Sequence, residues 1–82
     1  MIECNSIDEV RNNINNIDEQ IVKLIALRGH FVNQAAKFKK DSNAVKAPKR
    51  VEEVINKVKD LAKSAGANEE VVENVYRTMI DS

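Results

Sequence analysis

The sequence predicts an all-α fold of three helices, the first very long, in which two copies of the chain form an intertwined homodimer. Apolar residues recur at alternating steps of three and four over most of the chain, as one face of a helix requires. No segment shows the alternation of apolar and polar residues that is typical of a half-buried strand. The first helix is too long for one compact chain of 82 residues to cover, so a second copy is expected to complete its packing.

Composition limits the class of protein. The chain has 13 basic and 13 acidic side chains, and its net charge is zero. It contains no basic block and no pair of aromatic residues suited to stacking on bases, so we expect no nucleic-acid partner. No apolar run approaches the length of a membrane span and no secretory leader is recognisable, so we expect no membrane partner and a cytoplasmic location. The single cysteine, Cys4, can form no internal disulfide, which suits a reducing compartment.

The first predicted helix runs from Ile7 to Lys40. A capping box marks its start, because the Ser6 hydroxyl can accept from the Glu9 amide while the Glu9 carboxylate reaches back to the Ser6 amide. No proline interrupts this helix, and its one glycine, Gly29, costs about 1 kcal/mol relative to alanine without ending it. At about 1.5 Å per residue the rod is roughly 50 Å long. Its apolar stripe consists of Ile7, Val10, Ile14, Ile17, Ile21, Leu24, Phe31, Ala35 and Phe38.

A polar segment separates the first helix from the second. Residues 41–43 form a turn-prone cluster, and a loop continues to Ala47. Pro48 suits the first turn of the second helix, because its missing N–H is not needed there. Gly66 suits the left-handed position that ends it. The apolar face of this helix consists of Val51, Val54, Ile55, Val58, Leu61, Ala62 and Ala65.

The third predicted helix begins after Asn68, whose side chain can cap it, with Glu69 and Glu70 in its positive first turn. Its apolar face consists of Val71, Val72, Val75, Tyr76, Met79 and Ile80. The apolar pattern reaches the last residues without a C-cap signal, so we expect this helix to continue beyond Ser82. We interpret residues 1–82 as one helical domain that is shortened in its last helix.

Arg28 interrupts the long apolar stripe. It lies one heptad after Ile21 and one heptad before Ala35, where the helix otherwise presents apolar side chains to its packing partner. A cation directed into a core needs an anionic partner, which is either a structural carboxylate or a bound ligand. Lys39 follows at about 20° of rotation and about 16 Å along the axis, so the two side chains could hold a small dianion between them.

Arg11 and Arg50 extend this candidate site. Arg11 lies about 25 Å from Arg28 along the helix and about 100° around it, too far to serve the same pocket within one chain. In an antiparallel dimer the Arg11 end of one helix lies beside the middle of the other, so Arg11 is expected to enter the partner's site. Arg50 falls in the first turn of the second helix, where a cation opposes the helix dipole unless an anion lies nearby.

Each of these cations also has a purely structural explanation. Residues such as Lys39 and Arg50 are usually exposed on helix surfaces. Arg28 could be a salt-bridged or snorkelling interface residue. The single histidine, His30, lacks the Ser, Cys or Asp arrangement of a catalytic triad and is predicted to lie on the surface. The pattern therefore leaves a non-catalytic helical dimerisation module as an alternative to a ligand site.

Four segments carry a resemblance to known proteins: Val10–Asp18, Leu24–Arg28, Ala35–Lys39 and Ala47–Val51. Each contains one of the four cations above, and the spacing of the set is more specific than any one segment. Over essentially its whole length the sequence resembles the small all-helical chorismate mutase family. The resemblance implies an intertwined dimer with two sites, each of which includes Arg11 of the partner subunit.

The resemblance also implies roles for the four cations. Arg28 and the partner's Arg11 would bind the two carboxylates of chorismate, and Lys39 would hydrogen-bond the ether oxygen and a carboxylate. Arg50 would add positive potential beside the bound substrate. The implied reaction is the pericyclic rearrangement of chorismate to prephenate, which needs no cofactor, nucleophile or acid–base pair. Arg28 and Lys39 are the predicted catalytic residues, and all four cations are predicted to bind substrate.

Two features depart from the family pattern. The arginine of helix two in typical mutases is followed by a glutamate that binds the ring hydroxyl, whereas Val51 follows Arg50 here. The segment Ala47–Val51 is instead similar to the isochorismate-pyruvate lyase branch, whose members form salicylate and pyruvate by a related pericyclic elimination. A glutamine that the family supplies from its last helix would lie beyond Ser82. From the resemblance as a whole we predict a chorismate mutase, and from these two departures we keep isochorismate-pyruvate lyase as the alternative.

Overall fold

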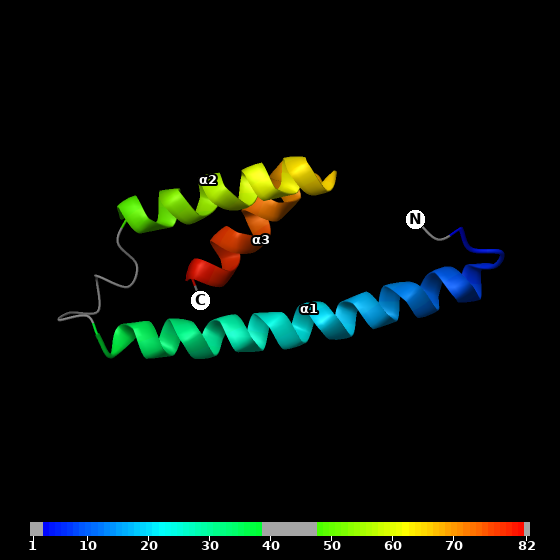
Figure 1. Cartoon of the computed structure of the whole chain (residues 1–82), viewed down its shortest axis with the longest axis horizontal. Coiled ribbons are helices and arrows are strands. Elements are labelled where there is room, and N and C mark those ends of the chain that lie inside the picture. Colours follow the sequence, from blue (N-terminus) through cyan, green and yellow to red (C-terminus); the bar gives the residue numbers. More distant parts are fainter. Residues whose placement is uncertain (1–2, 39–47, 82) are drawn as a thin grey trace. The chain divides into compact units, whose positions relative to one another are not determined.

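The computed structural model describes residues 3–38 and 48–81 of the chain. All regular structure within these residues is helical: α1 is Ile7–Ala36, α2 is Pro48–Ala65 and α3 is Glu69–Asp81 (Figure 1). The chain divides into two compact units, of which the first contains α1 and the second contains α2 and α3. The prediction of three helices with a long first helix is confirmed. No helix in the described ranges combines the length and the apolar character needed to cross a membrane.

Only one of the two predicted hydrogen bonds of the capping box forms at the start of α1. Ser6 has extended backbone geometry, and its Oγ accepts from the Glu9 amide at 3.1 Å. The Glu9 carboxylate does not reach back to Ser6 as predicted, because Oε2 accepts from the Asn5 amide at 2.7 Å instead. Asn13 Nδ2 adds bonds to the Glu9 carbonyl at 3.0 Å and to Cys4 Sγ at 3.4 Å. Residues 4–6 are therefore held against the first turns of α1.

The end of α1 corrects the predicted helix length. The helix ends at Ala36 rather than at Lys40. The Lys37 amide donates to the Gln34 carbonyl at 3.1 Å and the Phe38 amide to the Ala35 carbonyl at 3.0 Å. These bonds span three residues instead of four, so the last turn tightens and the α-helix stops. Residues 39–40, the predicted turn at residues 41–43 and the loop to Ala47 lie outside the described residues.

The apolar stripe of α1 is exposed in this single chain. The helix has 30 residues and contains no buried residue, and its length is about 45 Å at 1.5 Å per residue. Large apolar side chains remain in contact with solvent along its whole length, including Ile14 (50% exposed), Ile21 (47%) and Phe31 (58%). Because isolated helices in water depend on packing for their stability, α1 requires a covering surface.

The second unit is a helical hairpin in which α2 and α3 pack against one another. Its core consists of Ile55, Val58 and Ala62 of α2, which are 2%, 7% and 4% exposed. A large aliphatic side chain buried to this extent stabilises a fold by about 1.5–3 kcal/mol. The predicted apolar faces are confirmed at these positions. Leu61 and Val71 of the same predicted faces are 57% and 56% exposed in this single chain, because a pair of helices covers only one side of each member.

The turn between α2 and α3 follows the predicted chemistry. Gly66 has a φ of +75°, the left-handed geometry that favours glycine at a helix end. The Ala67 amide donates to the Ala62 carbonyl at 2.8 Å and the Gly66 amide to the Lys63 carbonyl at 3.3 Å, the pair of bonds of a Schellman motif. Asn68 then caps α3, since its Oδ1 accepts from the Val71 amide at 3.1 Å.

Candidate functional site

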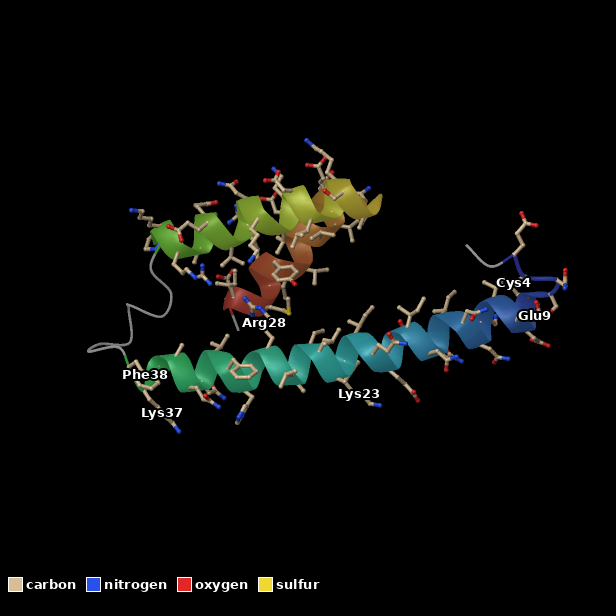
Figure 2. All side chains as sticks on the ribbon, viewed as in Figure 1. Cys4, Glu9, Lys23, Arg28, Lys37 and Phe38 are labelled. Carbon is tan, nitrogen blue, oxygen red and sulfur yellow. The ribbon has the colours of Figure 1, made fainter. Side chains whose placement is uncertain are left out.

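Arg28 lies on the apolar side of α1, as the heptad spacing predicts. Figure 2 shows its side chain on the opposite side of the helix from Lys23 and Lys37. It is half-buried, whereas most residues of α1 are exposed. The structure therefore places a permanently charged guanidinium within the stripe formed by residues such as Ile21 and Leu24.

Arg11 lies on the same helix and is exposed. Because α1 is continuous from Ile7 to Ala36, the helical spacing holds, and Arg11 stays about 25 Å from Arg28 along the axis. A single helix therefore cannot bring these two side chains to one small ligand. This geometry leaves the predicted role of Arg11 to a site on another chain.

Lys39 lies outside the described residues. The α-helix α1 ends at Ala36, and the predicted placement of Lys39 beside Arg28 stays a prediction.

Arg50 lies in the first turn of α2, within the second unit. Its Nη1 atom is 3.8 Å from Oε2 of Glu53, and the Arg50 side chain is 68% exposed. Exposed pairs of this kind contribute at most about 1 kcal/mol to stability. In the single chain Arg50 therefore has the environment of an ordinary surface arginine with a nearby carboxylate.

An ion-pair cluster at one edge of the α2–α3 hairpin was not foreseen from the sequence. Arg77 donates to Glu73 at 2.8 Å and approaches Glu52 of α2 at 3.3 Å, while Lys59 of α2 lies 3.6 Å from Glu73. The hydrogen bond from Arg77, helped by the charge of Lys59, lowers the pKa of Glu73. The hydrogen bonds to Glu73 and then to Glu52 raise the pKa of Arg77. The spacing of four between Glu73 and Arg77 is a signal for the pair within α3, but nothing local indicates its partners on α2.

The two carboxylates that follow Val51 in α2 both have ion-pair partners. Val51 is half-buried. Glu52, the next residue, accepts from Arg77 at 3.3–3.4 Å, and Glu53 lies beside Arg50. Both glutamates that follow Val51 therefore face a cation within the hairpin.

His30 has the exposed position that its sequence context predicts. Its Nε2 lies 2.8 Å from Nε2 of Gln34, and an amide nitrogen can only donate, so the imidazole nitrogen accepts. The ring also meets Phe31 edge-on, with centroids 5.8 Å apart. Across residues 3–38 and 48–81, no three His, Cys, Asp or Glu side chains are grouped as a metal site would require.

Comparison with known proteins places the sequence in a family. The model of the type II chorismate mutase family matches residues 10–82, a range that includes all four candidate cations. A relative named isochorismate pyruvate lyase, from Pseudomonas aeruginosa, is 28% identical over 78 residues, which cover 95% of this chain and 77% of that protein. The resemblance inferred from the four cation-containing segments is thereby confirmed. The chain belongs to the chorismate mutase type II family.

Proposed function

We propose that this protein catalyses a pericyclic reaction of a chorismate-type dianion, with the rearrangement of chorismate to prephenate as its principal reaction. The observation that carries this proposal is the family match over residues 10–82. The half-buried Arg28 on the stripe of α1 supports it, because a guanidinium can bind a substrate carboxylate through two parallel hydrogen bonds.

Each cation has a role in this proposal. Arg28 and Arg11 of the partner subunit bind the two carboxylates, as paired guanidinium and carboxylate groups do in a bidentate manner. Lys39 donates to the ether oxygen and to a carboxylate. Arg50 adds positive potential at the start of α2. Arg28 and Lys39 contact the reacting part of the substrate and are therefore the catalytic residues.

The proposed catalysis is positional and electrostatic. Two carboxylate anchors hold the substrate in the conformer whose reacting carbons lie close together, which removes an entropic part of the barrier. The Lys39 ammonium stabilises the negative charge that develops on the ether oxygen as the C–O bond breaks. The bonds form and break within the substrate, so the protein supplies no nucleophile and transfers no proton.

The proposal requires a dimer. Two antiparallel copies of α1 cover one another's stripes and bring the Arg11 end of each helix beside the middle of the other. The support is the exposed stripe of α1 together with the distance of about 25 Å that separates Arg11 from Arg28. We further propose that residues 1–82 of both chains act as one functional domain, in which neither chain contains a complete site.

A second candidate function is the elimination of pyruvate from isochorismate to form salicylate. Val51 favours it, because an apolar side chain follows Arg50 where typical mutases have a glutamate for the ring hydroxyl. The neighbouring Glu52 and Glu53 each face a cation of the hairpin, so neither offers an unpaired carboxylate as a replacement. The name of the Pseudomonas aeruginosa relative points in the same direction.

A paired turnover assay with chorismate and isochorismate tests both candidates. Prephenate as the faster product supports the mutase and makes Val51 a tolerated substitution. Salicylate and pyruvate as the faster products support the lyase. If the folded protein turns over neither substrate, the enzymatic proposal fails and a helical dimerisation module remains.

A further inference from the structure

Gly29 occupies a position in α1 that its own chain does not explain. Glycine is among the least favourable residues in a helix interior. Among the described glycines only Gly66 has a positive φ, so Gly29 is not required by backbone geometry. A Cβ built at Gly29 would meet no atom within 4 Å outside its own helix backbone. Neither conformation nor packing within the described chain therefore excludes alanine here.

The proposed dimer places a specific residue beside Gly29. This step depends on the proposed function, because the register follows from setting the partner's Arg11 opposite Arg28. In an antiparallel pair of α1 helices, the two-fold axis then passes between Glu19 and Gln20, and Val10 of the partner subunit lies opposite Gly29. The first turns of one helix thus lie at the level of Gly29 in the other.

The directions of the side chains around the helix axes also bring the partner's Arg11 toward Gly29. At about 100° per residue, Gly29 lies about 100° from Arg28 around the helix. Arg11 lies about 100° from Arg28 in the same rotational sense. The two-fold axis that relates two antiparallel helices is perpendicular to the plane that contains both of them. Two side chains rotated by the same angle from the contact face, one on each helix, therefore lie on the same side of that plane. The partner subunit's Arg11 and the hydrogen side chain of Gly29 therefore face the same side, at adjacent levels.

We propose that Gly29 is a positioning residue that leaves space for the partner's Arg11. Without a side chain at Gly29, the long guanidinium stem can lie across the backbone of α1 and reach the anion beside Arg28. A methyl group at this position would occupy the path and displace the guanidinium. Gly29 itself touches neither the substrate nor the reacting atoms.

The test is the Gly29→Ala variant. Helix propensity predicts that its fold is at least as stable as the wild type, whereas the proposal predicts that its turnover falls. Alanine favours the helix, and its Cβ would meet no atom of the described residues within 4 Å outside the helix backbone, so the variant is expected to fold with at least the helicity of the wild type. The proposal predicts that kcat/KM nevertheless falls about tenfold or more, because a small displacement of a substrate-binding group has effects of this size. Asn12→Ala is the matched control, since Asn12 is exposed on the side of α1 away from Arg28 and gains helix propensity without loss of turnover.

A double-mutant cycle with Arg11→Ala separates the possible outcomes. If Gly29 acts through the partner's Arg11, Gly29→Ala produces no further loss in the Arg11→Ala background. Equal losses in both backgrounds, or dissociation of the dimer by Gly29→Ala, overturn the inference. So does wild-type turnover by Gly29→Ala when Arg11→Ala is impaired, and this result leaves the proposed function intact. Absence of turnover by the wild type itself overturns both.

Discussion

Arg28 shows at the scale of a single residue how a sequence can mark a site. Its position on an apolar stripe would be unfavourable for any permanent charge without a counter-ion. Arginine suits such a position if the counter-ion is a carboxylate, because its planar fork donates two parallel hydrogen bonds and its charge persists at all relevant pH values. The stripe around it supplies an apolar surface that strengthens this interaction by excluding water.

Substitution of Arg28 is expected to reduce catalysis while the chain remains folded. Removing one partner of a hydrogen-bonded charge pair costs about 2–5 kcal/mol, so Arg28→Ala should lower kcat/KM by about thirtyfold or more. Steady-state kinetics measure this loss, and circular dichroism with sedimentation checks the fold and the dimer. Lys23→Ala is the matched control, because Lys23 lies on the opposite side of α1 (Figure 2). A variant that changes only dimer stability would contradict a ligand-binding role.

Gly66 provides a second test at this scale. Its φ of +75° is unfavourable for a residue with a Cβ, by about 1–2 kcal/mol. Since a Cβ there would meet no atom within 4 Å, the loss on Gly66→Ala is conformational and not steric. We expect lower stability in chemical denaturation and a smaller loss for Gly66→Asn, because asparagine tolerates this geometry better. An unchanged midpoint for Gly66→Ala would contradict the left-handed cap.

At the scale of elements, both apolar burial and ion pairs hold the α2–α3 hairpin together. Its core is small, with three buried apolar residues in α2. One edge carries the ion-pair cluster of Glu52, Lys59, Glu73 and Arg77. Leu61, Val71 and Val75 remain exposed outside the core. Ion pairs between α2 and α3 thus add to the contacts of the small apolar core.

The cluster predicts an acid-sensitive hairpin. The pKa of Glu73 is lowered, chiefly by the hydrogen bond from Arg77. A carboxyl group with a lowered pKa stabilises the fold above its unfolded pKa, and this contribution is lost as the pH falls through the folded pKa. The melting temperature should therefore fall as the solution is acidified below the ordinary pKa of a glutamate, about 4.5. Glu73→Gln should flatten this dependence.

Asp60→Asn serves as the control for this measurement, because Asp60 is an exposed acidic residue of α2 that forms none of the ion pairs of the cluster. It removes the same charge from the hairpin without touching Arg77. If Asp60→Asn flattens the acid dependence as much as Glu73→Gln does, the effect belongs to overall charge and not to the cluster.

At the scale of the whole molecule, the exposed stripe of α1 and the separation of Arg11 from Arg28 have the same explanation in the proposed dimer. A helix of 30 residues with no buried side chain lacks the packing from which most helical stability in proteins comes. In the proposed dimer a second copy would supply both an apolar surface and a second guanidinium. Dimerisation and assembly of the site would then be one event.

Subunit mixing tests this arrangement. Homodimers of Arg11→Ala and of Arg28→Ala each lack one anchor in both sites. A mixed dimer has one site with both arginines intact and one with neither, if Arg11 acts across the interface. Refolding equal amounts of the two variants together should restore about a quarter of the wild-type turnover by random pairing of subunits. Turnover no higher than that of the separate variants would contradict a site shared between chains.

The parts of this protein that the sequence determined are those governed by neighbouring residues. Ser6 and Asn68 cap their helices and Gly66 ends α2, because each of these bonds joins residues a few positions apart. The apolar period likewise placed Arg28 on the stripe of α1, since helical rotation depends only on sequence separation. The family match spans residues 10–82, a range that includes the four predicted substrate-binding cations.

The tertiary structure decided what depends on competing or distant contacts. The last turn of α1 tightened after Gln34 because three-residue hydrogen bonds replaced four-residue ones, so the helix ends at Ala36 and not at Lys40. Leu61 and Val71 satisfy the apolar pattern but remain exposed, because a two-helix hairpin covers one side only. Arg77 binds Glu52 across 25 positions of sequence. Periodicity describes the faces of a helix, but only packing determines which face is covered and which charges meet.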